Sequence, residues 1–448
     1  MERWGTYSTD SSRRLILHAN LTILDHDSRP RADPDRNAPP RNTPLNDRSK
    51  SVNSRLIVAE LNKTGTEHAT FNSALLQSLY REAKRRNCQL QWFCEAAQRQ
   101  AVLSLGHAEL GSIPWRPVKI HSGLTRAFIK KFIRELAATA QLISKARREN
   151  ASIIFLSVFP NILPLLLLTR RIFRRVPVHV ILHGEIESLL IPEKQAINRE
   201  GFWVKLALFH LYSPSWPSLY VLGSGIRERL LACFPDVKSL QTITAIEHPY
   251  PFTEIAPQAP SHRSARRIGF VGVGRRIKGI LDFYHLAESL STHVKRGELE
   301  FVLVGALEKG VAPQRHGAVT VLAPQGIGLS TDEYKRAISE LDCAVFLSTQ
   351  NYSLTASGSV FDIINAGVEI FTLKSAYLSD LSRLDVEGGM RFFASASEIA
   401  IEICRRLEHG WPTRRFLYPE IRRTHAPSLL DGIASMIIPQ FPTQTEQT

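Results

Sequence analysis

The stretch FVGVGRRIKGILDFY, from Phe270 to Tyr284, joins an apolar run to a glycine-rich, cationic turn and then to a helical pattern. The β-branched and aromatic residues before Gly272 predict a buried strand, and the apolar spacing after the turn predicts a helix. A strand that passes through glycines into a helix is the unit from which helix-covered parallel sheets are built. We therefore take this stretch as the pattern that decides the fold class.

The same alternation of strand and helix continues on both sides of this stretch. Short β-branched runs between amphipathic stretches fill residues 55–248, and the pattern restarts over 266–410. Proline and polar residues without an apolar period predict a linker over 249–265. The sequence thus predicts an α/β protein with two Rossmann-like, doubly wound parallel-sheet domains that face each other across a cleft. We expect closing helices over 411–438 and a tail over 439–448.

The first 54 residues differ in composition from the rest of the chain. Proline, charged and small polar residues dominate much of this segment, which predicts a disordered or loosely attached tail. It holds D-x-D twice, as Asp25/Asp27 and Asp33/Asp35, a spacing that can chelate a metal ion. Because a flexible tail cannot hold a coordination geometry, we interpret both pairs as solvated linker and expect no metal cofactor.

Charge and composition narrow the partners and the compartment. The 448 residues carry a formal net charge of +14, which favours phosphate-bearing partners such as nucleotides, nucleic acid or an anionic membrane face. The cations are spread over both halves without an aromatic-interleaved basic motif, so nucleic acid is the least favoured partner. Five scattered cysteines indicate a reduced compartment. With no signal-peptide pattern, we expect a cytoplasmic protein, and peripheral contact with the inner membrane face stays open.

The turn after Phe270 has the composition of an anion site. Gly272 and Gly274 permit close approach of backbone to a ligand, which suits a pyrophosphate beside cationic side chains. The third glycine of the dinucleotide fingerprint is replaced by Ile277, so a nicotinamide site is weakly supported. A solvated turn is the alternative interpretation. The cations of the turn are Arg275, Arg276 and Lys278.

A second strand end supports the anion interpretation. A predicted strand near residue 345 leads into a hydroxyl-rich loop and then into a helix that begins near Ser357, Gly358 and Ser359. The free N–H groups of a first helical turn, with these residues around them, form an anion site that requires no metal. Ser357 as an N-cap is compatible with this role. Asp362, just inside the helix, is a candidate acceptor for ribose hydroxyls, with compensation of the helix dipole as the alternative.

These two strand ends resemble the nucleotide-sugar domain of GT-B glycosyltransferases, above all the large retaining family that carries G-R-x-x-x-x-K-G after one strand and E-x7-E after a later one. Gly272 and Lys278 fit the first motif in spacing. Val273 stands where the arginine would be, and Arg275 or Arg276 is the candidate substitute.

In the second motif, Asp362 matches the later glutamate and Leu354 stands at the earlier one. In the family the first glutamate helps to position the donor sugar, so this difference bears on donor identity and on activity. It motivates an alternative function, a non-catalytic nucleotide-sugar-binding scaffold of the same fold.

The N-terminal half resembles the acceptor domain of the same fold. The segment LNKTGTEH looks like the first strand-to-helix turn, where Gly65 would approach the donor diphosphate. The segment ILHGEIESLL looks like the strand that ends in a cleft-facing histidine. The resemblance implies that His183 contacts the transferred sugar or the acceptor, and that Glu185 or Glu187 handles a proton.

From Arg55 to about Ile438 the resemblance implies a metal-independent, hexosyltransferase-like glycosyltransferase. It would use a nucleotide diphosphate sugar as donor and a glycan or lipid-linked molecule as acceptor, in polysaccharide biosynthesis. The leucine-rich segment from Pro160 to Pro177 ends in several arginines, a pattern that fits contact with an anionic bilayer. A buried helix with a solvated cationic end is the alternative interpretation.

Overall fold

The computed structural model describes most of the chain after the first 53 residues. By its internal contacts, Val52–Thr448 is one compact unit. The N-terminal segment with both D-x-D pairs lies outside the described residues. The described residues are 54–120, 128–168, 175–190, 199–213, 217–254, 264–312, 318–323, 328–348, 353–411, 416–430, 434–435 and 437–438.

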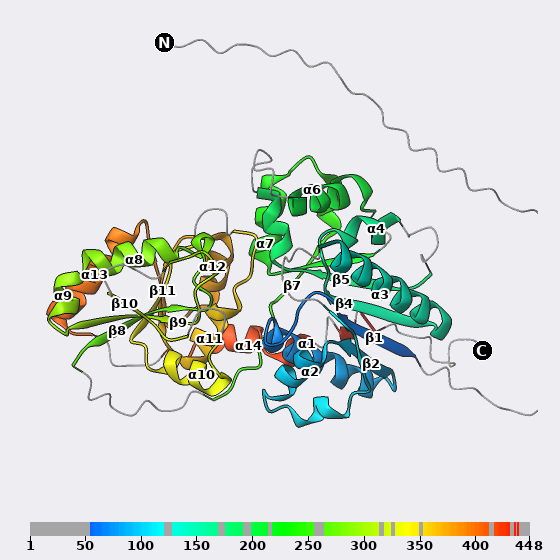
Figure 1. Cartoon of the computed structure of the whole chain (residues 1–448), viewed down its shortest axis with the longest axis horizontal. Helices are drawn as coiled ribbons and strands as arrows, with labels where there is room; N and C mark the ends of the chain where they lie inside the picture. Colours follow the sequence, from blue (N-terminus) through cyan, green and yellow to red (C-terminus); the bar gives the residue numbers. More distant parts are fainter. Residues whose placement is uncertain are drawn as a thin grey trace, which may run out of the picture. The chain divides into compact units, whose positions relative to one another are not determined.

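The N-terminal sheet has seven parallel strands in the order β3-β2-β1-β4-β5-β6-β7 (Figure 1). The strands are β1 (Arg55–Glu60), β2 (Gln89–Cys94), β3 (Trp115–Pro117), β4 (Ala151–Ser157), β5 (Val178–Leu182), β6 (Ser218–Leu222) and β7 (Thr244–Ile246). The helices used below are α1 (Ala69–Arg85), α2 (Ala96–Leu103), α3 (Phe128–Glu149), α4 (Ile162–Leu168), α6 (Arg199–Lys205), α7 (Ser224–Cys233) and the short 3-10 helix η2 (Gly184–Leu190).

The C-terminal sheet has six parallel strands in the order β10-β9-β8-β11-β12-β13. The strands are β8 (Arg266–Val271), β9 (Leu299–Val304), β10 (Val319–Val321), β11 (Cys343–Phe346), β12 (Glu369–Leu373) and β13 (Met390–Phe393). The helices used below are α8 (Ile280–Ser289), α10 (Thr331–Ser339), α11 (Gly358–Ala366), α12 (Ala376–Leu381), α13 (Ala396–His409) and α14 (Pro419–Thr424), with the short η5 (Arg276–Lys278). Two all-parallel sheets with helices between their strands confirm the predicted fold class.

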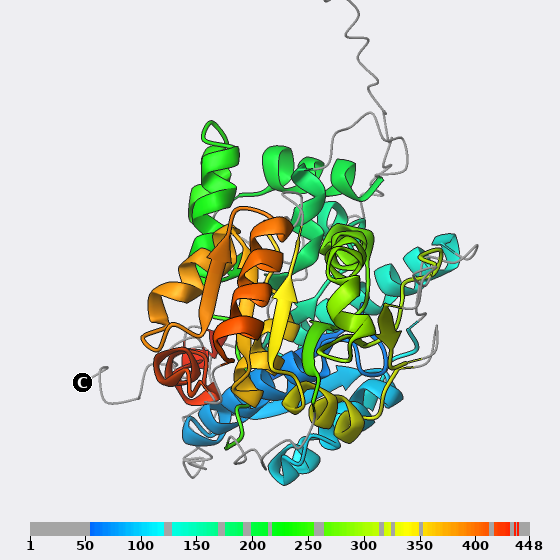
Figure 2. The same ribbon diagram turned by 90° about the vertical axis from the view of Figure 1, so that its left-hand side faces the viewer.

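Alternate residues of each strand pack against the helices on opposite faces of the sheet, because successive side chains of a strand point to opposite faces. In β8, Phe270 packs with the cluster that holds α8 and α13, and Val271 packs with the cluster that holds α10 and α11. Figure 2 shows the C-terminal sheet in front, with α8 and α13 on the near side of its strands. The continuous apolar runs read in the sequence are therefore strands buried on both faces.

The N-terminal sheet is layered in the same way, and the end of the chain returns to it. Ile57 packs toward α3 and α4, whereas Leu56 packs toward α1 and the closing residues Ile437 and Ile438. The backbone carbonyl of Ile438 accepts a hydrogen bond of 2.5 Å from the Arg86 guanidinium, just past α1. The last described residues of the predicted closing segment thus pack on the N-terminal sheet. Earlier in the same segment, the Phe416 N–H and the Tyr418 hydroxyl donate hydrogen bonds to the Gly367 and Val368 carbonyls before β12 of the C-terminal sheet.

No helix among the described residues is long and apolar enough to span a membrane. The leucine-rich helix α4 is seven residues long, and its last residue, Leu168, is exposed. Most of the arginines that follow it, from 169 to 174, lie outside the described residues.

Two of the contacts that join the described parts of the two sheets are made by carboxylates. The Asp380 carboxylate, on α12, accepts hydrogen bonds from Ser224 Oγ at 2.6 Å and from the Gly225 backbone N–H at 2.9 Å, at the start of α7. In the second, the Glu187 carboxylate binds the loop before α11, as described below. Both are carboxylate acceptors facing backbone donors.

The turn between β8 and α8 depends on one glycine. Gly279 has a φ of 82°, and a Cβ at this position would lie 2.1 Å from the Leu347 carbonyl oxygen. We expect Gly279→Ala to lower the free energy of unfolding by about 3 kcal/mol, from left-handed strain plus a backbone clash. Urea unfolding of the full chain measures this loss.

The matched control is Gly297→Ala, because Gly297 also has a positive φ of 68° but has open space around its Cβ position. There we expect a loss of about 1 kcal/mol, from strain alone. Equal losses in the two variants would show that the backbone at Leu347 moves aside without cost.

Candidate functional site

Two segments far apart in the sequence meet at the carboxyl edge of the C-terminal sheet. Gly272 directly follows β8 with a φ of 100°. A Cβ placed on it would lie 3.6 Å from Ser359 Oγ and 4.0 Å from Lys278 Nζ. Because the first N–H groups of α11 have no partner inside the helix, an ammonium, a hydroxyl and backbone donors converge here. Such a combination of groups can bind an anion.

The start of α11 holds its hydroxyls together. Ser357 precedes the helix as its N-cap but makes no capping hydrogen bond with its side chain. Its hydroxyl lies 2.9 Å from the Ser359 hydroxyl instead. Gly358, between them, has open space around its Cβ position. The predicted Ser357 to Ser359 group is therefore a compact cluster of hydroxyl and backbone groups.

The three predicted cations differ in placement. Lys278 ends η5, is half-buried and lies next to Gly272. Arg275 is exposed, with its guanidinium 3.6 Å from the Glu308 carboxylate. Arg276 is also exposed. Lys278 is thus the predicted cation whose charged end is shown close to Gly272, whereas Arg275 and Arg276 point to the surface of the turn with exposed side chains.

The glycines of this turn allow the backbone after β8 to pack closely against the backbone after β9. Gly274 forms a parallel bridge with Leu307, and a Cβ on it would lie 3.0 Å from the Leu307 side chain. A Cβ on Gly305, after β9, would lie 2.2 Å from the Gly272 carbonyl oxygen. The ends of β8 and β9 therefore approach more closely than side chains would allow.

Asp362 is tied to two tyrosines that sequence reasoning missed. Its carboxylate accepts hydrogen bonds from the Tyr250 hydroxyl at 2.7 Å and from the Tyr334 hydroxyl at 3.1 Å. Burial raises the pKa of Asp362, although both hydroxyls and the nearby charge of Lys278 oppose that rise. Tyr250 lies in the segment between the sheets and Tyr334 on α10, so Asp362 fixes both against α11. A carboxylate has about four acceptor positions, which leaves capacity for a ribose hydroxyl.

His183 follows β5 and is held in one tautomer. Its Nε2 lies 2.7 Å from the Leu156 carbonyl oxygen. A carbonyl only accepts, so Nε2 carries the proton and Nδ1 is left as an acceptor. Burial lowers the pKa of His183 to about 3, with the Leu156 bond opposing this and the Lys63 charge adding to it. At neutral pH this side chain is an uncharged hydrogen-bond acceptor.

A column of rings connects His183 to α11. The His183 ring centroid lies 4.3 Å from that of His68 and 4.7 Å from that of Phe71. Phe71 contacts His248 at 5.2 Å, and His248 stacks on Phe361 of α11 at 4.8 Å. Burial lowers the pKa of His248 to about 3, so the column is uncharged. His248 is not among the site residues predicted from the sequence, because ring stacking with a residue more than 100 positions away leaves no local signal.

Glu187 binds backbone instead of lying open in the cleft. Its oxygens accept hydrogen bonds from the N–H groups of Ser353 at 2.8 Å and Leu354 at 2.7 Å, and from Thr355 Oγ1 at 3.0 Å. Burial raises its pKa, and these bonds oppose the rise. Leu354 is fully buried. The position that would carry the first glutamate of E-x7-E is thus apolar, and its backbone is held by a carboxylate from the other sheet.

Glu185 occupies the first turn of η2, two residues after His183, and is half-buried. Its backbone carbonyl accepts a hydrogen bond from Ser188 Oγ at 2.5 Å. Of the two predicted proton-handling glutamates, Glu185 remains a candidate for this role by position, whereas the contacts of Glu187 make it a positioning residue.

The turn that contains Gly65 is held by a buried carboxylate at the end of β1. Gly65 has a φ of 56° with open space at its Cβ position, and its N–H lies 3.5 Å from Glu95 Oε2. Glu60 is fully buried and accepts hydrogen bonds from the turn, from α1 and from β4. Its donors are the backbone N–H groups of Asn62 and Lys63 at 3.0 and 3.1 Å, Asn72 Nδ2 at 3.2 Å and Ser157 Oγ.

A second buried carboxylate lies near Glu60, on the first turns of α3. Glu135 is 5% exposed, and its nearest cation is the Lys131 ammonium at 3.6 Å. Lys131 Nζ also lies 4.7 Å from the ring centroid of Phe159. Burial raises the pKa of Glu135 to about 7 despite Lys131, and the Glu60 charge adds to the rise.

Solved structures share this arrangement of sheets over almost their whole length. HepE of Anabaena in complex with UDP is 12% identical, with 86% of this chain and 95% of that chain covered and a TM-score of 0.51. TarM is 9% identical, with 86% and 99% covered and a TM-score of 0.57. WaaG, a glycosyltransferase involved in lipopolysaccharide biosynthesis, is 12% identical, with 85% and 99% covered and a TM-score of 0.53.

The chain has the GT-B glycosyltransferase fold. The predicted resemblance to GT-B proteins is thereby confirmed at the level of the fold. No family model matches the chain, and no curated protein matches it in sequence.

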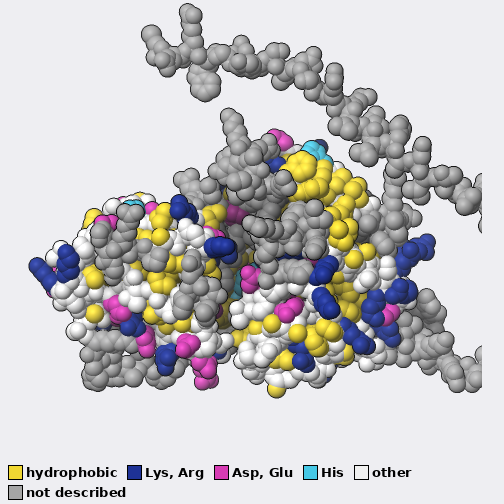
Figure 3. Space-filling model, viewed as in Figure 1, with side chains coloured by type: hydrophobic (Ala, Val, Ile, Leu, Met, Phe, Trp, Pro, Cys, Tyr) yellow, Lys and Arg dark blue, Asp and Glu magenta, His cyan; other side chains and the backbone are white. Residues whose placement is uncertain are grey.

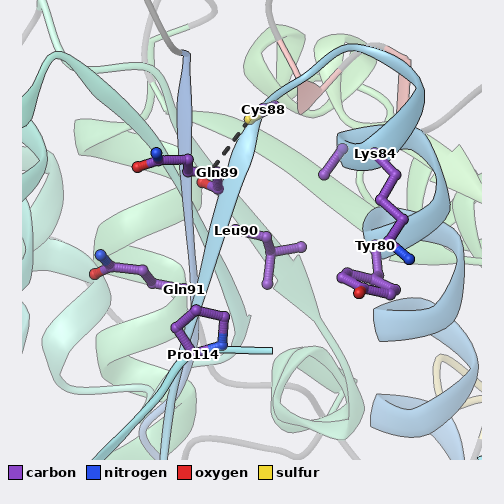
Figure 4. Close-up of a pocket in the computed structure, with 8 residues that line it drawn as sticks. Tyr80, Lys84, Cys88, Gln89, Leu90, Gln91 and Pro114 are labelled. Atoms are coloured by element: carbon purple, nitrogen blue, oxygen red, sulfur yellow. Dashed lines mark hydrogen bonds between the residues drawn. The ribbon is translucent and has the colours of Figure 1, made fainter. Parts of the chain in front are cut away.

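A cavity of this GT-B protein lies away from the groups described above. It measures about 390 Å³ and lies between the C-terminal half of α1 and the amino end of β2 (Figure 4). Ligands of doubly wound folds bind at the carboxyl ends of the strands. The cavity therefore lies at the wrong end of β2 for a substrate site. Its lining residues are Tyr80, Ala83, Lys84, Cys88, Gln89, Leu90, Gln91 and Pro114.

The buried carboxyl group of Glu135 predicts a pH-dependent stability. Its folded-state pKa of about 7 lies above the ordinary value of 4.5, so ionisation costs the folded state stability as pH rises from 4.5 through 7. Glu135→Gln removes this cost. We expect the variant to gain roughly 1–2 kcal/mol relative to the wild type between pH 5.5 and pH 8.5, measured by urea unfolding at both pH values.

Glu149→Gln, at the other end of α3, is the matched control. The pKa of Glu149 is lowered: burial raises it, but Lys145 and Arg55 outweigh that effect. Its stabilising charge is present above pH 4.5, so this variant should lose rather than gain stability at neutral pH. Parallel pH profiles for Glu135→Gln and the wild type would show that Glu135 ionises without cost.

Proposed function

We propose that this chain is a glycosyltransferase that moves a sugar from a nucleotide diphosphate sugar to a glycan or lipid-linked acceptor. The observation that carries the proposal is the meeting of Gly272, Lys278 and the start of α11 at one sheet edge. HepE, a protein of the same fold, has been solved with UDP and with UDP-glucose. WaaG and WaaB, which share the fold, act in lipopolysaccharide assembly by their descriptions, which supports polysaccharide biosynthesis as the setting.

On the donor side, we assign the diphosphate to Lys278 and to the Ser357, Gly358 and Ser359 group, and the ribose to Asp362. Arg275 and Arg276 are exposed near this turn and would reach the phosphates only by side-chain movement. The cation and the helix N-terminus stabilise the charge on the departing diphosphate, a role that a metal has in other folds. The proposed reaction therefore requires no metal.

In the transfer itself, the bond between the sugar C1 and the diphosphate oxygen breaks, and the acceptor oxygen bonds to C1. The acceptor hydroxyl loses its proton, which we assign to Glu185 beside the strand end. Neutral His183 accepts a hydrogen bond at Nδ1 from a sugar or acceptor hydroxyl. Gly65 lets its turn approach the diphosphate from the N-terminal sheet. Closure of the two sheets on the donor would exclude water.

A nucleotide-sugar-binding scaffold is the alternative, favoured by the apolar, buried Leu354 and by the engagement of Glu187 with backbone. A scaffold would bind a donor and leave it intact, whereas a transferase hydrolyses its donor slowly. Turnover therefore separates the two proposals.

The test is a metal-free panel of UDP-, GDP-, ADP- and CMP-sugars, followed by thermal shift and nucleotide release. We expect one donor to stabilise the wild type. Lys278→Ala should weaken that binding about tenfold or more, because a charge-assisted phosphate contact contributes roughly 1.5–3 kcal/mol. Lys295→Ala is the control and should bind as the wild type does, because Lys295 is exposed at the end of the short helix α9 (Ser291–Lys295), which precedes β9.

His183→Ala should keep donor binding and lose most of the nucleotide release, since this residue contacts the sugar side in the proposal. Stabilisation without release in the wild type would favour the scaffold. If no donor stabilises the chain, or if Lys278→Ala binds unchanged, the donor site is assigned wrongly.

We further propose peripheral contact with anionic membranes through the N-terminal sheet. Hydrophobic side chains gather over α4 and α6 on the face shown in Figure 3, where Leu168 is 61% exposed and Phe202 62% exposed. Exposed cations on α3 lie on the same side of the sheet, among them Arg134 and Arg147. An apolar surface beside cations is suited to an interfacial position on anionic lipid.

Co-sedimentation with phosphatidylglycerol vesicles tests this contact. We expect the wild type to sediment with these vesicles and not with phosphatidylcholine vesicles. Phe202→Glu should reduce the bound fraction several-fold, and Phe392→Glu, an exposed phenylalanine on the C-terminal sheet, should not. Equal sedimentation of both variants would remove the assignment to α6.

A further inference from the structure

All but one of the buried glutamates among the described residues accept hydrogen bonds, and the exception is Glu135. Each of the others accepts hydrogen bonds: Glu60 and Glu187 from backbone and hydroxyl groups, and three more from arginines. Glu135 alone has both carboxylate oxygens buried without a hydrogen-bond donor. Its ion pair with Lys131, at 3.6 Å, is longer than a hydrogen bond. The glutamates paired with arginine are Glu82, Glu369 and Glu402.

A second unsatisfied acceptor lies in the loop that Lys131 contacts. Lys131 Nζ lies over the ring of Phe159, and Asn161, two residues later, is 2% exposed with its Oδ1 lacking any donor. These three buried oxygens therefore lack partners of one kind, namely hydrogen-bond donors. A ligand rich in hydroxyl groups supplies such donors.

The position of this cluster fits a substrate site. Helix α3 precedes β4 and runs antiparallel to the strands, so its first turns lie at the carboxyl edge of the N-terminal sheet. Glu60 ends β1 at this edge, and its charge acts on Glu135. Lys63, held by Glu60, is half-buried and close enough to His183 for its charge to lower the pKa of that histidine. The cluster thus lies at the same edge of the sheet as the proposed transfer site.

We propose that Glu135, Lys131 and Asn161 form an acceptor subsite that binds the hydroxyl groups of a saccharide. This inference rests on the proposed transferase function and names the part of the site that would select the acceptor. The Glu135 oxygens and Asn161 Oδ1 accept hydrogen bonds from sugar hydroxyls, and the Lys131 ammonium donates to a sugar oxygen. The contact of the Lys131 ammonium with the ring of Phe159 orients this cation beside Glu135.

A structural role alone explains Glu135 poorly. A buried carboxylate without donors lowers stability, and a glutamine of the same shape would avoid that cost. Unsatisfied polar groups of this kind are typical of sites that bind ligands, where the ligand completes the hydrogen bonds.

Saturation-transfer difference NMR tests the subsite on the full chain with UDP present. The probes are methyl glycosides of glucose, galactose, mannose and N-acetylglucosamine in both anomers. We expect at least one to bind the wild type and Glu149→Gln, and to bind Glu135→Gln about tenfold more weakly or worse. Asn161→Ala should also weaken the same probe and serves as the second variant if Glu135→Gln does not fold.

Each outcome bears on the proposal. Equal binding by the wild type, Glu135→Gln and Asn161→Ala would overturn it and leave Glu135 with a structural role. Binding of UDP but of none of the glycosides would overturn the subsite and leave the proposed transferase standing. Binding of a glycoside through Glu135 without any nucleotide binding would support the saccharide subsite and overturn the transferase.

Discussion

Buried and half-buried carboxylates that accept hydrogen bonds from backbone and hydroxyl groups hold this structure together where regular structure ends. Glu60 fixes the turn after β1, Glu187 and Asp380 each bind a donor group from the opposite sheet, and Asp362 holds two tyrosines against α11. A buried carboxylate is costly without donors, and loop N–H groups are costly without acceptors. Each therefore satisfies the other, and the loops at the carboxyl edges acquire fixed conformations.

This use of carboxylates shapes the chemistry of the candidate site. These acidic side chains are engaged in hydrogen bonds within the protein. The groups that could bind an anion are Lys278, serine hydroxyls and the N–H groups at the start of α11. Because His183 and His248 are buried among rings, their pKa values fall and they stay uncharged at neutral pH. The site then combines a fixed neutral acceptor on one side with a cationic, hydroxyl-rich surface on the other. This arrangement fits the proposed reaction, in which a sugar moves from an anionic diphosphate to a neutral acceptor hydroxyl.

The ring column and the carboxylate contacts also link the two sheets mechanically. His248 follows β7 and stacks on Phe361, one residue before Asp362. Glu187 binds the loop four residues before α11 begins. A ligand at the start of α11 would therefore act on groups that are anchored in the N-terminal sheet. The two sheets meet through packed rings and hydrogen bonds, not through the connecting segment alone.

The sequence by itself determined the fold class and the two strand-end turns. Continuous β-branched apolar runs, glycines and helical spacing are local patterns, so Gly272, Lys278 and Ser357 to Ser359 could be found from the sequence. Only the tertiary structure decided which cations reach the turn, that Glu187 binds the Leu354 backbone, and that Tyr250 and Tyr334 meet on Asp362. These contacts join residues 28 to 167 positions apart, and no local spacing encodes them. The lack of donors around Glu135 is of the same kind, because burial and hydrogen-bond satisfaction exist only once the chain has folded.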